Sequence, residues 1–189
     1  KFRITCDDPG VPVDESNLVW QAARALWAHL GRAGEPKGVT VDIAKQIPVA
    51  AGLGGGSADA AAALVALNRV WKGDVADWDL TGLAADLGAD VPYFLFGGTA
   101  LGLGRGDRLF PLVDLSPRWV VLACPPFGVS MADAYGWFDA DGPEPAEPSG
   151  LATWDAGVLE VHNDLQAPVV RRHPEILSLV DALGEAGAE

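Results

Sequence analysis

A glycine-rich segment near residue 54 carries the clearest chemical information in this sequence. Residues 52, 54, 55 and 56 are all glycine, Pro48 precedes them and Ser57 follows. Glycine adopts positive φ angles readily and has no Cβ, so the backbone N–H groups of such a segment can converge on an anion. The alanine-rich residues that follow predict a helix, whose N-terminus adds about half a positive charge at the same place. The segment therefore predicts a phosphate-binding turn rather than a flexible linker.

Two well-known phosphate-binding motifs do not fit this turn. The P-loop needs a Lys-Ser or Lys-Thr pair after its last glycine, whereas Ser57 and Ala58 follow Gly56. The dinucleotide-binding fingerprint needs a third glycine where Ser57 stands and an acidic residue at the end of the next strand. The segment is therefore neither of these motifs, but a glycine turn that lacks the lysine and is followed by a serine.

The flanking patterns predict the elements that hold the turn in place. Residues 39–44 alternate between apolar and polar, which predicts a half-buried strand that enters the glycine segment. Ser57 predicts the N-cap of a helix over residues 58–71. Residues 1–6 predict another strand, and a capping Ser16 or Asn17 predicts a helix that Gly31 ends.

The rest of the chain mixes helices and strands. Residues 80–87 predict a short helix, and Asp90 follows before Val91 and Pro92, which we expect to keep the backbone extended. Residues 118–124 predict a buried strand, residues 139–150 a loop, and the residues from 169 onward an amphipathic helix. Because strands and helices do not alternate regularly, the order predicts an α+β fold.

Composition and charge exclude several classes of partner. The chain has 189 residues, of which 49% are apolar, so it can bury a core. Thirteen Lys and Arg against 26 Asp and Glu give a net charge of -13, which argues against a nucleic-acid surface. No apolar run is long enough to span a membrane, and Cys6 and Cys124 lie far apart without a CxxC pattern. We expect a cytoplasmic protein, a monomer or homodimer, with no nucleic-acid or membrane partner.

Three separated motifs resemble those of the GHMP kinases, the family named for galactokinase and for the homoserine, mevalonate and phosphomevalonate kinases. They are the glycine turn with residues 57–61, the segment 87–95 around Asp90, and residues 163–169. Within the family, they are most similar to the members that phosphorylate the 2-hydroxyl of a cytidine diphosphate ester of methylerythritol, on the methylerythritol phosphate route to isoprenoids. The resemblance implies a two-domain fold, with a domain like ribosomal protein S5 at 1–114 and an α+β domain at 115–189, both incomplete here.

The resemblance also implies roles for particular residues. It implies a kinase that uses ATP and Mg²⁺ on a small-molecule alcohol, with Asp90 as the catalytic base and the Ser57 hydroxyl as a candidate ligand of Mg²⁺. Lys45 either contacts the nucleotide or is a solvated surface charge. The residues expected to bind ATP are Lys45, Pro48, Val49, Ala50, Ala51, Gly52, Leu53, Gly54, Gly55, Gly56, Ser57 and Ala58.

Further residues receive weaker assignments. Asp59 lies in the first turn of the predicted helix, where phosphates would repel a carboxylate, so we expect it to face away or to act through structure. Glycines at 102, 104 and 106 would let the backbone approach the substrate. Tyr135 or Trp137 is a candidate for stacking on the cytosine ring.

Two alternatives stay open. Another GHMP kinase, of the homoserine or mevalonate type, would share the glycine turn but not the substrate. A noncatalytic nucleotide-binding module would share only the fold. The family pattern also has a lysine-bearing N-terminal strand and a third glycine-rich motif, neither of which lies within these 189 residues. The family pairs that lysine with the aspartate at position 90, so the acid-base competence of Asp90 depends on it.

Overall fold

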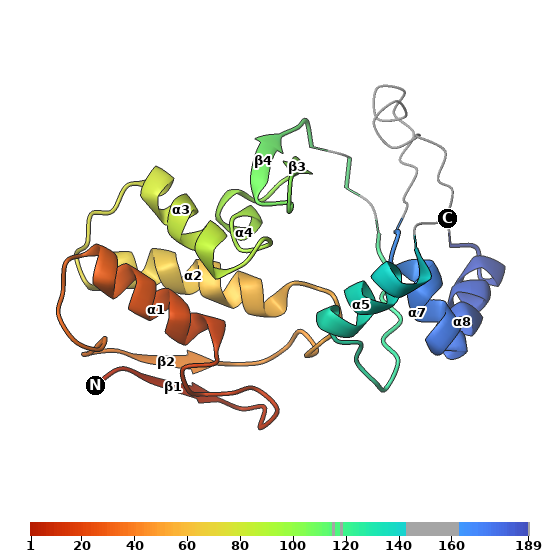
Figure 1. Cartoon of the computed structure of the whole chain (residues 1–189), viewed down its shortest axis with the longest axis horizontal. Coiled ribbons are helices and arrows are strands. Elements are labelled where there is room, and N and C mark those ends of the chain that lie inside the picture. Colours follow the sequence, from red (N-terminus) through yellow and green to blue (C-terminus); the bar gives the residue numbers. More distant parts are fainter. Residues whose placement is uncertain (115, 118, 143–162, 189) are drawn as a thin grey trace. The chain divides into compact units, whose positions relative to one another are not determined.

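The chain folds into two units, Lys1–Trp119 and Val120–Glu189, in a computed structural model that describes residues 1–114, 116–117, 119–142 and 163–188 (Figure 1). Both strands and helices are present in the first unit, and the predicted α+β class is confirmed. The assignment of residues 1–114 and 115–189 to two family domains stays a prediction.

The first unit begins with two strands joined by a helix. Strand β1 (Arg3–Cys6) pairs in parallel with β2 (Thr40–Ile43), and helix α1 (Leu18–His29) connects them. Asn17 is the N-cap of α1, because its side chain accepts a hydrogen bond from the N–H of Val19 at 2.8 Å. Helix α2 (Gly55–Val70) follows β2 after the glycine turn and packs beside α1 (Figure 1).

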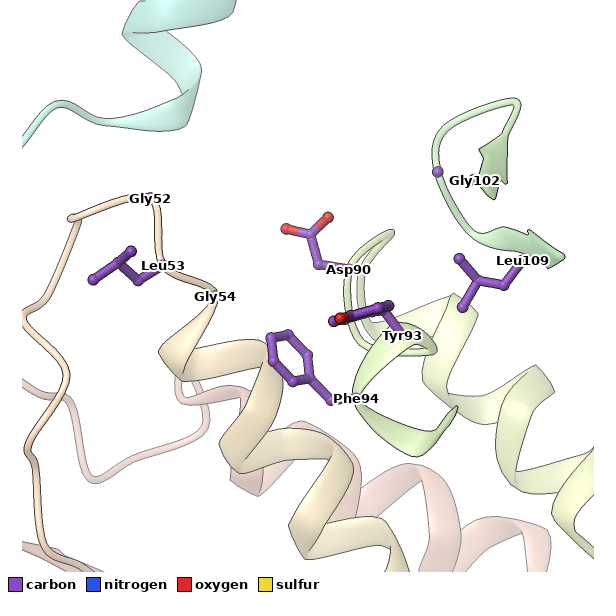
Figure 2. Close-up of a pocket in the computed structure, with 9 residues that line it drawn as sticks. Gly52, Leu53, Gly54, Asp90, Tyr93, Phe94, Gly102 and Leu109 are labelled. Atoms are coloured by element: carbon purple, nitrogen blue, oxygen red, sulfur yellow. The ribbon is translucent and has the colours of Figure 1, made fainter. Parts of the chain in front are cut away.

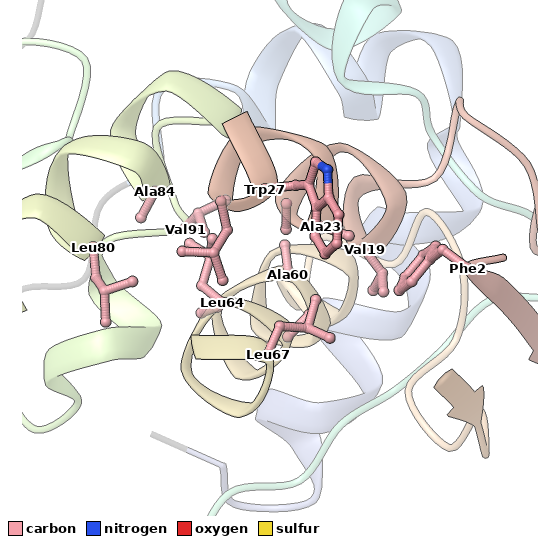
Figure 3. Close-up of a cluster of buried hydrophobic side chains, with 14 of the residues drawn as sticks. Phe2, Val19, Ala23, Trp27, Ala60, Leu64, Leu67, Leu80, Ala84 and Val91 are labelled. Atoms are coloured by element: carbon pink, nitrogen blue, oxygen red, sulfur yellow. The ribbon is translucent and has the colours of Figure 1, made fainter. Parts of the chain in front are cut away.

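An apolar core fixes the positions of these elements. Small residues let α1 and α2 approach closely, because Ala23 and Ala60 are fully buried where the two helices meet (Figure 3). Phe2, just before β1, and Leu64 and Leu67 from α2 fill the space around them, each with at most 2% of its surface exposed. The start of α2 is therefore attached to a well-packed base.

The described remainder of the first unit contains two helices and a hairpin, which lie across from the glycine turn. Helix α3 (Asp77–Leu87) packs on α1 and α2 through Leu80 and Ala84. A short helix, α4 (Tyr93–Phe96), follows, and then an antiparallel hairpin of β3 (Ala100–Leu103) and β4 (Arg108–Pro111).

The regular secondary structure of the second unit is helical in the described residues. Helix α5 (Met131–Asp141) is followed by α7 (Gln166–Arg172) and α8 (Pro174–Glu185). The helix predicted from residue 169 onward is thus two helices, because Pro174 lacks an N–H and suits the first position of a new helix. No helix in the described ranges is long and apolar enough to cross a bilayer.

Two local predictions need correction. The buried strand predicted at 118–124 is wrong for the described residues 119–124, which lie in no strand, with Trp119 fully exposed and Val120 76% exposed. An apolar run is buried only where another element covers it, and no described element does so here. The loop predicted at 139–150 is also wrong at its start, since residues 139–141 end α5; residues 143–150 lie outside the described part.

An ion pair ties α5 to α7. The Asp141 carboxylate accepts hydrogen bonds from both terminal nitrogens of Arg172, at 2.6 and 2.9 Å, and one from Nε of Arg171 at 3.1 Å. The hydrogen bonds from Arg172 are the main cause that lowers the pKa of the Asp141 carboxyl to about 2. The same guanidinium lies 5.3 Å from the centre of the Trp137 ring.

This pair predicts a pH dependence of stability. Because the pKa of Asp141 is lower in the folded state, its stabilising contribution is complete above about pH 4 and is lost as the pH falls toward 2. Thermal unfolding of the wild type and of Asp141→Asn should therefore differ at pH 6 and converge near pH 2. A constant difference between the two proteins across this range would contradict the role of the pair.

Candidate active site

The glycine turn ends in a helix start that has no capping side chain. Gly54 is the N-cap of α2 with φ of 69°, in the left-handed region, and α2 begins at Gly55. The prediction that Ser57 caps the helix is wrong, because the left-handed Gly54 is the N-cap, three positions earlier than expected, and Ser57 becomes the third residue of the helix.

The first turn of α2 offers a set of N–H donors. The first backbone hydrogen bond at this end runs from the N–H of Ala58 to the carbonyl of Gly54, at 2.9 Å. The N–H groups of Gly55, Gly56 and Ser57 therefore have no acceptor within the helix. Such groups at a helix N-terminus bind anions well, since the helix dipole has the matching sign.

The glycines of the turn differ in what a side chain at each position would meet. Gly52 and Gly54 have positive φ, and a Cβ on Gly54 would lie 2.7 Å from Cζ of Phe94. Gly55 does not have positive φ, but a Cβ there would lie 3.1 Å from Nζ of Lys45 and 3.2 Å from Ile47. A Cβ on Gly56 would meet only Leu18, at an ordinary 3.8 Å. At position 55, therefore, packing and not the backbone angle disfavours a side chain, because Lys45 and Ile47 would have to shift by a few tenths of an ångström.

A pocket of about 430 Å³ opens between the glycine turn and the hairpin (Figure 2). The carboxylate of Asp90 points into it, and the ring of Phe94 lies next to Gly54 on the same side. The lining residues are Gly52, Leu53, Gly54, Asp90, Tyr93, Phe94, Gly102, Gly106 and Leu109. The fold thus brings together the two sequence motifs from which a phosphate site and a catalytic base were predicted.

Asp90 stands on a turn that two buried neighbours hold. The expectation of an extended backbone is wrong, because the N–H of Val91 donates to the carbonyl of Gly88 at 3.2 Å and the chain turns. Val91 and Pro92 are almost completely buried, so the turn is anchored while the Asp90 carboxylate is exposed. None of the ion pairs between described residues involves Asp90.

Lys45 lies beneath the helix start and not on the surface. Its side chain is only 10% exposed, and its Nζ lies 3.6 Å from Oδ2 of Asp59. Its backbone N–H donates to Oδ1 of Asp7 at 2.8 Å. The alternative of a solvated surface charge is therefore wrong. Neither contact was predicted, since the partners are distant in sequence and no local pattern links them.

Only some of the other residues that were expected to contact the substrate line the pocket. Gly102 and Gly106 line the pocket, but a Cβ on Gly102 would lie 3.1 Å from the backbone of Gly106, so the hairpin itself needs this glycine. Gly104 is not among the lining residues. Tyr135 and Trp137 belong to the second unit, and their stacking on cytosine stays a prediction. In the described ranges, no group of three His, Cys, Asp or Glu residues could hold a metal ion.

Comparison with known sequences points to one family. The profile of the GHMP kinases N terminal domain matches residues 17–98. Three relatives named 4-diphosphocytidyl-2-C-methyl-D-erythritol kinase are 44–45% identical: those of Nocardioides sp., Deinococcus radiodurans and Pelotomaculum thermopropionicum. The alignments cover 96%, 98% and 99% of this chain and 64%, 63% and 67% of the relatives. The chain thus spans about two thirds of the length of the curated relatives that it matches.

Solved structures agree with the sequence comparison. A crystal structure of 4-(cytidine 5'-diphospho)-2C-methyl-D-erythritol kinase is 31% identical with a TM-score of 0.61, and the match covers 96% of this chain and 66% of the other. The homoserine kinase of Cytophaga hutchinsonii is 25% identical with a TM-score of 0.55, over 83% of this chain and 52% of the other. On sequence and structure together, the chain belongs to the GHMP kinase family.

Proposed function

We propose that the protein transfers the γ-phosphate of ATP to the 2-hydroxyl of 4-diphosphocytidyl-2-C-methyl-D-erythritol. The observation that carries this proposal is the common pocket onto which the glycine turn and Asp90 both open. A phosphate cradle beside a free carboxylate is the arrangement that phosphoryl transfer to an alcohol requires. The substrate is the one in the names of the relatives that are 44–45% identical.

The reaction divides between these two features. The N–H groups at the start of α2 hold phosphate oxygens of ATP and so keep the γ-phosphorus in line with the acceptor hydroxyl. As the hydroxyl oxygen bonds to the γ-phosphorus, the bond from phosphorus to the β–γ bridging oxygen breaks and ADP leaves. The hydroxyl proton passes to the Asp90 carboxylate. In this proposal, the residues that bind ATP are Lys45 and the turn from Pro48 to Ala58.

The residues present are compatible with Mg²⁺ that arrives with ATP. Mg²⁺ in kinases usually keeps several waters and phosphate oxygens and takes only one or two protein ligands. The Ser57 hydroxyl, in the first turn of α2, is the proposed protein ligand. Bound there, the ion would neutralise negative charge on the phosphates.

The setting of the proposed reaction follows from its substrates. ATP and a cytidine diphosphate ester are both soluble, and we propose that the enzyme acts on them in the cytoplasm. It would do so as a monomer or a homodimer, without a nucleic-acid or membrane partner.

The acceptor specificity tests the proposal. The full-length protein with Mg²⁺-ATP should phosphorylate the cytidyl ester and should fail with homoserine and mevalonate, as followed by ADP release and by mass spectrometry of the product. Turnover of homoserine or mevalonate without turnover of the cytidyl ester would assign another kinase of the family. ATP binding without any turnover would favour a noncatalytic module.

The Asp90→Asn substitution tests the proposed base. It should lower kcat by about 10²- to 10⁴-fold, the range typical of a lost proton acceptor, and leave the Kd for ATP nearly unchanged. Asparagine keeps the shape of the side chain, so the buried anchors Val91 and Pro92 should preserve the turn. An unchanged melting temperature provides the control for folding. A variant with near-normal kcat would show that Asp90 is not the catalytic base and serves only in the turn.

A further inference from the structure

The ammonium group of Lys45 is buried beneath the helix that receives the phosphates. The side chain is 10% exposed, and a Cβ on Gly55 would stand 3.1 Å from its Nζ. Burial of a charged group is costly unless a partner of opposite charge compensates for it. In the part of the chain that the structure describes, the carboxylate that forms an ion pair with Lys45 is that of Asp59.

Two carboxylates from different elements fix Lys45. Asp7, just after β1, accepts a hydrogen bond from its backbone N–H, and Asp59, within α2, pairs with its side chain. Gly55 and Asp59 are four residues apart and so lie on one face of α2. The ammonium group is therefore held against the first helical turn, on the face that Gly55 leaves open.

We propose, on the basis of the proposed function, that Asp59 is a positioning residue of the phosphate site. It holds the Lys45 ammonium against the first turn of α2, where this positive charge adds to the N–H donors of the turn. Lysine has a long flexible side chain, which leaves this place when its partner is lost. Gly55 completes the arrangement because any larger residue would displace Nζ.

The charge of Asp59 by itself would act in the opposite direction. The carboxylate is 40% exposed and lies one turn from the proposed phosphate position, so direct repulsion would weaken ATP binding. Removal of the charge would then strengthen binding. If Asp59 acts through Lys45, removal weakens binding instead. The sign of the change in affinity therefore separates the two roles.

The experiment is a double-mutant cycle on the full-length protein, with Mg²⁺-ATP as the probe in isothermal titration calorimetry. Asp59→Asn should raise the Kd about three- to tenfold, and Lys45→Met should raise it at least as much. In the Lys45→Met background, Asp59→Asn should not weaken ATP binding further, because the only remaining effect of the Asp59 carboxylate is its direct repulsion of the phosphates. Asp59→Glu should restore most of the affinity.

Steady-state kinetics and a matched control complete the test. The KM for ATP should rise in Asp59→Asn while kcat stays within about twofold, since the acceptor and Asp90 are untouched. Asp79→Asn removes an exposed carboxylate from the first turn of α3, outside the pocket, and should leave the Kd for ATP unchanged.

The outcomes separate this inference from the proposed function. A wild-type protein that does not bind Mg²⁺-ATP overturns both. A wild type that binds, together with an Asp59→Asn variant of equal or higher affinity, or with additive effects in the double mutant, overturns the positioning role alone. If Asp59→Asn does not fold, the variants Lys45→Arg and Lys45→Met provide the test. The affinity for ATP must be kept in Lys45→Arg, which retains the positive charge, and must fall in Lys45→Met, which lacks it.

Discussion

The proposed phosphate site depends above all on the unpaired N–H groups at the start of α2. Gly54 is left-handed and has no side chain, so the helix begins abruptly and three donors stay free of any cap. A glycine cap gives up roughly a few tenths of a kcal/mol relative to serine or asparagine. The packing of Ala60, Leu64 and Leu67 in the apolar core, beside α1, holds the helix in place without that cap. In the proposed function, a phosphate group of ATP takes the position that a capping side chain would otherwise occupy.

A local positive field must arise here within a strongly acidic protein. The net charge of -13 repels nucleotides, but dissolved salt screens such repulsion beyond about 8–10 Å at ionic strengths of about 0.1–0.15 M. The helix start and the Lys45 ammonium act within that distance. Asp7 accepts a hydrogen bond from the backbone of this lysine and Asp59 pairs with its side chain, so the proposed positioning role gives these two acidic residues a function beside a site for an anionic ligand.

Local patterns in the sequence were enough to predict the strands around residues 3–6 and 40–43, the glycine turn and the α+β class. They failed where distant contacts decide. Gly54 was not predicted as the N-cap because serine is the commoner capping residue and Ser57 follows three residues later. Lys45 could not be assigned to a buried position, since its partners are remote in sequence. Residues 119–124 have the composition of a buried strand, but burial depends on a covering element and not on composition.

The backbone amide spectrum of the full-length protein during a titration with Mg²⁺-ATP tests the central claim most directly. If the start of α2 binds the phosphates, the N–H resonances of Gly54, Gly55, Gly56 and Ser57 should shift in a saturable manner, and ADP should shift them less than ATP. Saturable ATP binding that leaves these four resonances in place and shifts residues elsewhere would contradict the account.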